Sequence, residues 1–307
     1  MLLPKTPQPT GWKETRPITL SSTMLKAMAQ LLQSRLGGRL REPSRIQYAI
    51  RGKQAAEMTV TLQRLIRVAD EWGLPLLLAK LDVRQAFDRV AQQRVARLLV
   101  ERCGAAAPWE VAAWLDMIFA RELRIHIAGR ELGVRQSNGV RQGSPDSPTL
   151  FSLLNEEVAI AALRRDPGGL TTTGSANMVP GAIPAAMLLF MDDAWVIALQ
   201  WGQLQTRVTN LMDELAEVGL ALGPGKTQVL AAPASPPGAL RMHGEVIPPV
   251  PVGTPVSALG TGVGFRIPIN TPMKEACTRA RGAYWGQHTL FLREGPISKK
   301  IQLFERT

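Results

Sequence analysis

Two adjacent carboxylates lie between two runs of apolar residues, and this arrangement constrains the fold more than any other part of the chain. Asp192 and Asp193 interrupt an otherwise apolar stretch over residues 187–199, and a third carboxylate, Asp82, ends the mainly apolar run Leu76–Leu81. Ionised carboxylates beside buried apolar segments need a compensating cation. We therefore expect two strands joined by a tight hairpin at Asp192-Asp193, and another strand that ends at Asp82.

Two kinds of cation could compensate these carboxylates. The chain has 36 lysines and arginines against 25 acidic residues, so salt bridges with a purely structural role are one alternative. The other is a pair of divalent ions about 3.5–4 Å apart, which can bridge an attacking hydroxyl, a phosphoryl group and its leaving oxygen. Only three histidines and two cysteines are present. Oxygen ligands therefore favour Mg²⁺ or Mn²⁺ over Zn²⁺.

The net charge of +11 and the sequence pI near 10.3 favour a polyanionic partner, most often nucleic acid. A basic surface that serves solubility is the alternative. The hydrophobic fraction of 45% indicates a folded core. No run of uncharged apolar residues is long enough to span a membrane, so we expect no membrane partner.

Helices and strands are expected in mixed order. Hydrophobic periodicity predicts helices over 22–36, 55–72, 90–103, 108–120, 147–165 and 202–218, and strands over 76–82, 123–128 and on both sides of Asp192-Asp193. The first helix should end at Gly37-Gly38 and the second at Gly73. Residues 40–54 are expected to form a basic loop or ribbon, 166–184 a loop, and 232–256 short edge pieces, with helical periodicity again from about 271. This order favours an α+β fold over a doubly wound sheet.

Two glycine-rich turns add further candidates. The segment 139–151 contains Gln142 and Gly143 and leads into a helix expected to begin at Ser147-Pro148, and helix N-termini and backbone amides bind phosphate. The segment 219–227 carries one cation, Lys226. It is not a P-loop, because Leu220 stands where that motif needs glycine.

Taken together, these segments resemble the reverse transcriptase domain of non-LTR (LINE-type) retrotransposons. The matching segments follow the family order over about residues 4–230. They are Arg-Pro-Ile-Thr-Leu at 16–20, Gln-Tyr-Ala-Ile-Arg-Gly-Lys at 47–53, Leu-Asp-Val-Arg-Gln-Ala-Phe-Asp at 81–88 (motif A), 139–151 (motif B), Phe-Met-Asp-Asp at 190–193 (motif C) and 219–227 (motif D). Residues 259–264 depart from the Tyr-Leu-Gly pattern of motif E.

The resemblance implies a right-hand polymerase, with a palm built on an antiparallel sheet, interleaved fingers and a partial thumb. Residues 1–265 would form fingers and palm, and 266–307 the start of a thumb. The chain stops without a closing signal, which predicts a truncated thumb. The sequence defines no compartment, although a LINE-type element would be compatible with an intracellular, nuclear location.

The resemblance also implies a role for each matching residue. Two Mg²⁺ ions, or Mn²⁺, would be bound by Asp82, Asp192, Asp193 and the Val83 carbonyl, and Lys226 would give a proton to pyrophosphate. The incoming dNTP would contact Arg16, Phe87 (a steric gate beneath the sugar), Gln142 and Gly143. The template and primer would contact Arg51, Lys53, Ser147 and Pro148. Asp146 would bring an unhelpful negative charge close to the template.

The expected function is RNA-directed DNA polymerisation, in which a dNTP is added to the 3′-hydroxyl of a DNA primer on an RNA template. Three alternatives stay open. The chain could be a degenerate retroelement fragment that binds nucleic acid with little or no polymerase activity. It could be a basic RNA-binding protein with a polymerase-like fold. It could also be a reverse transcriptase of the group II intron type.

Overall fold

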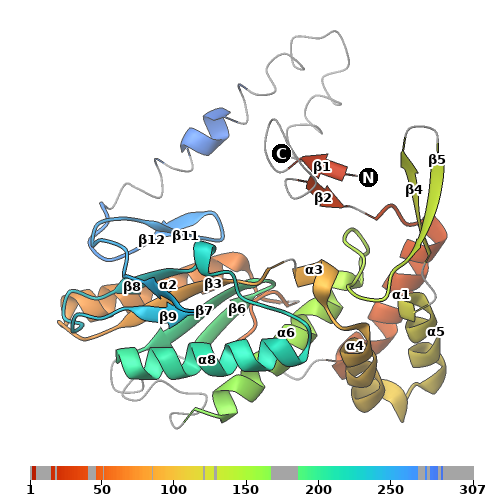
Figure 1. Cartoon of the computed structure of the whole chain (residues 1–307), viewed down its shortest axis with the longest axis horizontal. Helices are drawn as coiled ribbons and strands as arrows, with labels where there is room; N and C mark the ends of the chain where they lie inside the picture. The colour runs from red at the N-terminus through yellow and green to blue at the C-terminus, as the bar shows by residue number, and fades with distance from the viewer. Residues whose placement is uncertain are drawn as a thin grey trace.

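The structure is a computed structural model that describes residues 2–4, 15–17, 19–40, 46–50, 52–84, 86–119, 122–127, 130–166, 186–268, 274, 277–282 and 285. A four-stranded antiparallel sheet lies at its centre in the order β6-β7-β3-β8 (Figure 1). The strands are β3 (Leu77–Asp82), β6 (Met187–Phe190), β7 (Asp193–Ala198) and β8 (Gln228–Ala231). Helices packed on an antiparallel sheet confirm the α+β expectation.

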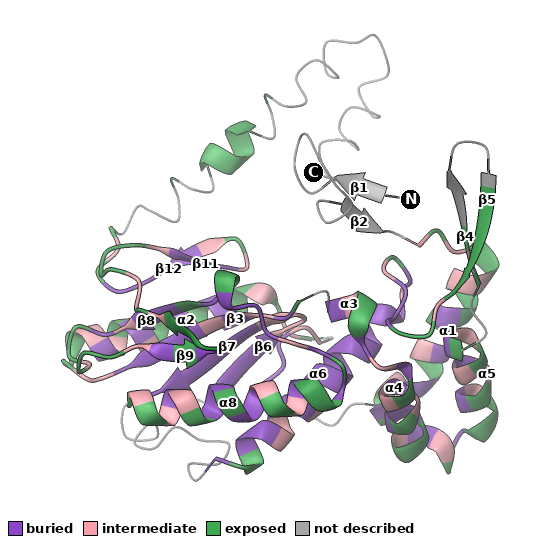
Figure 2. Ribbon diagram, viewed as in Figure 1, coloured by how far each residue is buried: buried purple, intermediate pink, exposed green. Residues whose placement is uncertain are grey.

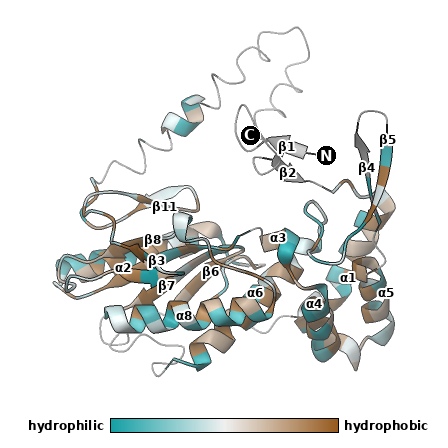
Figure 3. Cartoon of the chain, in the orientation of Figure 1, coloured by the Kyte–Doolittle hydropathy of each residue, from teal (hydrophilic) through white to brown (hydrophobic). Residues whose placement is uncertain are grey.

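The two faces of this sheet carry separate layers of the core. Along β3 the side chains alternate, so that Leu77 and Ala79 face one cluster of buried residues and Leu78 faces the other. Helices α6 (Ser147–Arg164) and α8 (Trp201–Glu217) cover the first face. Helix α2 (Ala55–Glu71) and the hairpin of β11 (Val256–Ala258) and β12 (Thr261–Val263) cover the second. Most residues of these strands are buried and apolar (Figures 2 and 3), and Lys80, Asp82, Asp193 and Gln228 are the polar exceptions.

A helical group lies beside the sheet and shares the first cluster of buried residues (Figure 1). Its members are α1 (Thr23–Leu40), α3 (Ala86–Arg89), α4 (Gln92–Leu99), the π-turn η2 (Val100–Gly104) and α5 (Pro108–Phe119). Strands β4 (Glu122–Ile127) and β5 (Arg130–Arg135) pair as an antiparallel hairpin that projects from this group. Strands β1 (Leu2–Pro4) and β2 (Thr15–Pro17) form a second two-stranded sheet.

Residues 46–48 extend the edge of the central sheet. The Leu189 N–H donates to the Ile46 carbonyl and the Tyr48 N–H donates to the Leu189 carbonyl, both at 2.8 Å. Gln47 thereby pairs in parallel with Leu189 of β6. Among the described residues of 40–54 this is a single isolated bridge, so the choice between loop and ribbon stays a prediction.

The expected end of the first helix at Gly37-Gly38 was wrong. Helix α1 continues through both glycines to Leu40. Two glycines in a helix cost about 1 kcal/mol each relative to alanine. Leu36 and Leu40 are 1% and 0% exposed, so burial of one further helical turn offsets that cost. Local propensity alone would have ended the helix too early.

The other expected elements were largely confirmed. Helices α2, α5, α6 and α8 and strands β3, β4, β6 and β7 begin and end within three residues of the predicted bounds. The helix expected over 90–103 is divided into α4 and η2, and α3 was not foreseen. Helix α6 has Asp146, not Ser147, at its N-cap. The proline-rich stretch forms β9 (Leu240–Met242), β10 (Glu245–Ile247) and β11, which are the short pieces expected there.

Some expectations lie outside the described residues. The loop expected over 166–184 is described only at Asp166, and the helix expected from about 271 only at 274, 277–282 and 285. The division at residues 265 and 266 therefore stays a prediction. Within the described part of the chain, no helix is both long and apolar enough to cross a membrane.

Candidate active site

The β6–β7 hairpin brings the two adjacent carboxylates to the edge of the sheet. Phe190 and Asp193 are paired residues of the two strands, so Met191 and Asp192 alone form the turn. Met191 has a φ of +54°, in the left-handed region that residues other than glycine seldom occupy. The apolar runs on both sides form the buried strands, and the carboxylates lie where those strands end.

Asp82 joins this hairpin from the neighbouring strand. It is the last residue of β3 and lies directly opposite Asp193 in the antiparallel pairing with β7. Because side chains alternate along each strand and paired residues share a face, Asp82 and Asp193 point to the same side of the sheet. This is the face that carries α2 and the β11–β12 hairpin. Asp82 and the Asp192-Asp193 turn therefore lie at the same edge of the sheet, and their joint binding of an ion stays a prediction.

The charges at this edge influence one another. Burial raises the pKa of the Asp193 carboxyl above its usual value, and the neighbouring negative charges of Asp192 and Asp82 raise it further. The ammonium groups of Lys80 and Lys226 act in the opposite direction. The edge thus concentrates negative charge that further cations would stabilise.

The turn that carries Lys226 is hydrogen-bonded to the end of β3. The Gly223 N–H donates to the Asp82 carbonyl at 3.0 Å, and the Arg84 N–H donates to the Ala221 carbonyl at 2.8 Å. Lys226 ends the 3₁₀ turn η3 (Pro224–Lys226) that follows. Its Nζ lies 3.1 Å from Asp82 Oδ2. The predicted motif D lysine therefore lies at the carboxylates, although 144 residues separate it from Asp82.

The donor atoms at this edge match a divalent ion in kind, since Mg²⁺ and Mn²⁺ prefer carboxylate and carbonyl oxygens. Among the described residues, however, no three acidic, histidine or cysteine side chains are gathered closely enough to enclose an ion. Asp82 contacts Lys226 instead. A divalent ion would therefore compete with the lysine for the Asp82 carboxylate. Val83, whose carbonyl was expected to be a further ligand, lies at the same edge, where it pairs with Leu222.

The glycine-rich turn before α6 packs against the segment that follows Asp82. Gly139 has a φ of +84°, and a Cβ atom there would lie 2.6 Å from the Asp88 carbonyl oxygen and 2.7 Å from that of Phe87. The Val140 N–H donates to the Phe87 carbonyl at 2.7 Å. Only glycine allows this close approach. Motif B is thus joined to motif A through the backbone.

Asp146 does not face a template, which corrects the expectation from the sequence. Its side chain is 2% exposed. Its carboxylate accepts hydrogen bonds from Trp114 Nε1 at 2.9 Å and from the Ser144 hydroxyl. Arg141 Nη2 lies 3.7 Å away. Asp146 is therefore a buried charge that is paired within the protein, and it adds no repulsion toward a template.

The other predicted residues of motif B differ in exposure. Gly143 is exposed, Gln142 and Pro148 are partly exposed, and Ser147 is buried. The Gln142 carbonyl accepts a hydrogen bond of 2.9 Å from the N–H of Thr19, which places the segment after β2 beside this turn. Gln142, Gly143 and Pro148 are accessible to a ligand, whereas the Ser147 side chain is not.

Phe87 lies in α3, five residues after Asp82. Its ring packs against the ring of Phe151 with centroids 5.0 Å apart and an interplanar angle of 29°. It is partly buried against the first cluster of the core. The aromatic pair joins the segment after β3 to helix α6, so the position of Phe87 is determined by packing.

The structure describes the three basic residues predicted to bind nucleotide or template to different extents. Arg16 lies on β2, where it pairs with Leu3, and its side chain is outside the description. Arg51 lies outside the described residues. Lys53 Nζ donates to the Gln47 carbonyl at 3.0 Å and lies 4.5 Å from the centroid of the Tyr48 ring. Burial lowers the pKa of Lys53.

Three polar residues to which sequence reasoning gave no individual role lie beside the β6–β7 hairpin or on the neighbouring strand β3. Lys80 donates to the Ser257 carbonyl of β11 at 2.7 Å. Gln47 is buried and donates to the Ser152 carbonyl of α6 at 3.4 Å. Asn155 of α6 donates to the Met191 carbonyl at 2.8 Å. Lys80 carried a signal, since it interrupts an apolar strand two residues before Asp82. The other two carried none, because their partners are distant in sequence.

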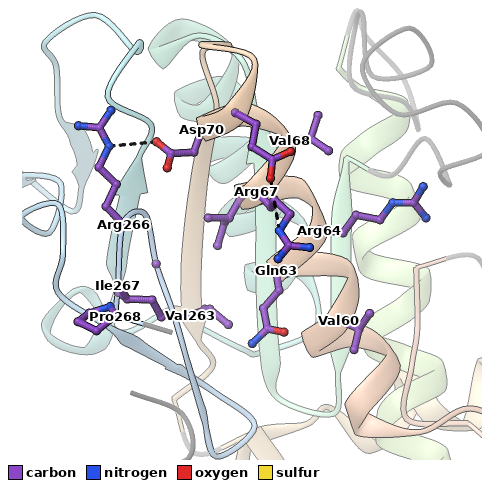
Figure 4. A pocket seen from close by; sticks show the side chains of 13 residues that line it. Val60, Gln63, Arg64, Arg67, Val68, Asp70, Val263, Arg266, Ile267 and Pro268 are labelled. Atoms are coloured by element: carbon purple, nitrogen blue, oxygen red, sulfur yellow. Dashed lines mark hydrogen bonds and ion pairs between the residues drawn. The ribbon is translucent and has the colours of Figure 1, made fainter. Parts of the chain in front are cut away.

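A groove of about 780 Å³ lies elsewhere, between α2 and the segment after β12 (Figure 4). Arg266 pairs with Asp70 across it at 3.2 Å, and Arg67 pairs with Glu71 along α2 at 3.6 Å. None of the three carboxylates lines this groove. This groove is therefore separate from the edge of the sheet that carries the carboxylates.

Comparisons with known proteins agree with this geometry. A family model described as reverse transcriptase (RNA-dependent DNA polymerase) matches residues 3–263. The chain is 29% identical over 235 residues to the retrovirus-related Pol polyprotein from type-1 retrotransposable element R2 of Nasonia vitripennis, with 75% of this chain and 22% of that protein covered. It is 28% identical over 196 residues to the transposon TX1 uncharacterized 149 kDa protein of Xenopus laevis, with 62% and 15% covered.

A solved structure supports the same architecture. The apo telomerase of Candida tropicalis truncated from its C-terminal domain is similar with a TM-score of 0.51 at 13% identity, over 78% of this chain and 44% of that chain. At this identity the likeness concerns the fold alone. The expected right-hand polymerase fold is thereby confirmed.

The fold is that of the right-hand class of polymerases. The chain belongs to the reverse transcriptase family of RNA-dependent DNA polymerases, and its curated relatives are Pol proteins of non-LTR retrotransposons. The family uses divalent metal ions and copies a nucleic-acid template. The chain spans about a fifth of the length of the Nasonia relative.

Proposed function

We propose that this chain catalyses RNA-directed DNA synthesis, with Asp82 and Asp192 as the essential carboxylates. The observation that carries the proposal is the pairing of Asp82 with Asp193 on adjacent strands, with Asp192 in the turn beside them. In this proposal the dNTP is the substrate, and the 3′-hydroxyl of a DNA primer on an RNA template is the acceptor.

The proposed metal ligands are the carboxylates of Asp82, Asp192 and Asp193 and the carbonyl of Val83, with Mg²⁺ or Mn²⁺ as the ion and two ions as the number. Such ions, when bound, would lower the pKa of the primer hydroxyl and neutralise charge on the departing pyrophosphate. The raised pKa of Asp193 supports the proposal, because it reflects mutual repulsion, in addition to burial, at one edge.

Lys226 would carry the proton that pyrophosphate needs. Its side chain is 74% exposed and its ammonium lies beside Asp82, so it can reach a phosphate bound at the same edge. A positioned acid of this kind contributes about 10²–10⁴-fold to a proton-transfer step. The contact with Asp82 holds the lysine at the edge before substrate arrives.

Substrate contacts are proposed for the exposed surface next to this edge. Gln142 and Gly143 would contact the incoming nucleotide, together with Arg16. Phe87 would lie beneath the sugar and exclude a 2′-hydroxyl. Pro148, Ser147, Arg51 and Lys53 would lie along the template and primer. The side chains of Ser147 and Lys53 are engaged within the protein, so their contribution would pass through the backbone or the local shape.

Primer extension on poly(rA)/oligo(dT) with Mg²⁺ tests this function directly. We expect incorporation of dTTP by the full chain, and a loss of at least about 10³-fold in Asp192→Ala, because the variant lacks an electrostatic interaction at the reacting centre. Asp213→Ala on the exposed surface of α8 is the matched control and should retain activity.

Template binding measured on the same proteins separates the alternatives. Asp192→Ala should bind the template–primer as tightly as the parent chain, since the phosphate backbone is bound by basic residues and not by this carboxylate. If the parent chain binds the duplex but incorporates no nucleotide with Mg²⁺ or Mn²⁺, the polymerase proposal fails. The chain would then be a nucleic-acid-binding relative without polymerase activity.

A further inference from the structure

The turn that presents Asp192 has an unfavourable backbone conformation. Both strands that lead to it are fixed by pairing, β6 with residues 46–48 and with β7. The turn itself contains only Met191 and Asp192, and Met191 adopts a φ of +54°. A residue with a Cβ atom occupies this region only when its surroundings favour it. A two-residue hairpin turn requires a positive φ at its first position, and this conformation is costly for a residue with a Cβ atom, so a contact from outside the hairpin would help to hold the turn.

Asn155 provides such a contact. It lies on α6 and is 2% exposed. Its Nδ2 donates a hydrogen bond of 2.8 Å to the Met191 carbonyl. That carbonyl belongs to the peptide bond between Met191 and Asp192, so the hydrogen bond restrains the plane of this peptide. The orientation of this peptide plane also sets the direction of the backbone at Asp192 and, with it, that of the Asp192 side chain.

Helix α6 is well placed to transmit this restraint. One turn before Asn155, the ring of Phe151 packs on Phe87, which follows Asp82 in sequence. The adjacent Ser152 carbonyl accepts a hydrogen bond of 3.4 Å from Gln47, which pairs with β6. Residues three and four apart lie on one face of a helix. The same face of α6 therefore contacts the segment after Asp82, the edge strand and the Asp192 turn.

We infer that Asn155 is a positioning residue, whose amide aligns the Asp192 carboxylate with Asp82 by holding the Met191–Asp192 peptide. The inference rests on the proposed polymerase function. Partners that orient a ligating or reacting group typically change activity by about 10–100-fold when they are removed. The loss should appear in kcat, because the Asn155 side chain is 2% exposed and is therefore not accessible to template or nucleotide.

The first test compares two buried asparagines in the full chain. Asn155→Leu and Asn155→Asp keep the approximate size of the side chain and remove its N–H donors. Asn210 on α8 is the matched control, since it is 8% exposed and its Nδ2 donates to the Ala162 carbonyl at 3.4 Å, remote from the hairpin. Both Asn155 variants should lower kcat by about 10–100-fold with less than about 3-fold change in the KM for dTTP and in the Kd for template–primer. Asn210→Leu should retain kcat within about 3-fold.

A second test asks whether Asn155 acts through the conformation of Met191. Glycine occupies positive φ without strain, so Met191→Gly should make the turn less dependent on the hydrogen bond. The kcat loss caused by Asn155→Leu should then be smaller in the Met191→Gly background than in the parent, because contacting residues give non-additive effects. Equal losses in both backgrounds, or an Asn155→Leu variant with unchanged kcat, would overturn the inference.

A readout that needs no activity separates this inference from the proposed function. With methionine methyl groups isotopically labelled, the Met191 resonance can be assigned from Met191→Leu. It should shift or broaden in Asn155→Leu and Asn155→Asp and stay in place in Asn210→Leu. If the parent chain proves inactive while the resonance shifts as expected, the polymerase proposal fails and the positioning role stands. If the resonance does not move in either Asn155 variant, the positioning role is wrong.

Discussion

The single residues that shape the site act through backbone constraints as much as through charge. Gly139 shows this most clearly, since its position is close enough to two carbonyl oxygens that no side chain fits. Asp146 shows that a charged residue inside a motif can serve packing, because its carboxylate is fully paired within the protein. The type of residue at these two positions is therefore determined by the atoms that surround it within the protein.

At the residue scale, Gly139→Ala should destabilise the protein. The left-handed φ and the overlap with the Phe87 and Asp88 carbonyls should together cost about 2–4 kcal/mol in the free energy of unfolding. Gly202→Ala is the control, because no atom of the described residues lies within 4 Å of the place that an added Cβ would take, and the position belongs to α8. Urea unfolding of both variants checks this, and equal midpoints would show that the turn can relax.

The elements of this fold depend on tertiary burial as much as on local propensity. Helix α1 illustrates the point, since it passes through Gly37-Gly38 to bury Leu40. Conversely, α2 ends where its sequence predicts, with Gly73 at a φ of +62° just beyond Trp72. Gly73, which has a positive φ, thus ends a helix, whereas Gly37 and Gly38, which do not, lie inside one.

At the element scale, Gly38→Ala should stabilise the protein by about 0.5–1 kcal/mol, because glycine within a helix lowers the stability by that amount relative to alanine. The position is open, with no atom of the described part of the chain within 4 Å of an added Cβ. Gly73→Ala is the matched comparison, since its surroundings are equally open but its φ is positive, so it should destabilise. Chemical unfolding measures both changes, and the same sign in both variants would contradict this account of α1.

At the scale of the whole molecule, the central sheet separates two clusters of buried residues and keeps its acidic edge between them. A buried ion pair between α8 and the segment after α6 contacts β7 near the opposite end of that strand. Arg207 of α8 donates from Nε to Asp166 Oδ2 at 2.7 Å and also donates to the Ile197 carbonyl. Burial lowers the pKa of Arg207, and its contact with Asp166 opposes that shift.

Removing one partner of this pair should be costly. Asp166→Asn leaves the Arg207 charge in an apolar layer, so we expect a loss of about 3–5 kcal/mol in the free energy of unfolding. Asp213→Asn removes one partner of the exposed Arg165 instead and should leave the unfolding midpoint unchanged. A small loss in Asp166→Asn would indicate that water reaches Arg207 and compensates its charge.

The sequence by itself determined the strands that end in Asp82 and meet at Asp192-Asp193. An apolar run can be buried in the sheet only if its charged residues lie at the ends of the strands, where they are accessible to solvent or cations. The sequence also determined the order of the motifs and hence the family. The tertiary structure alone decided that α1 continues past its glycines, that Asp146 is buried and that Asn155 meets the Met191 carbonyl. These outcomes depend on the energy of contacts between residues far apart in the chain. No local sequence pattern predicts such contacts.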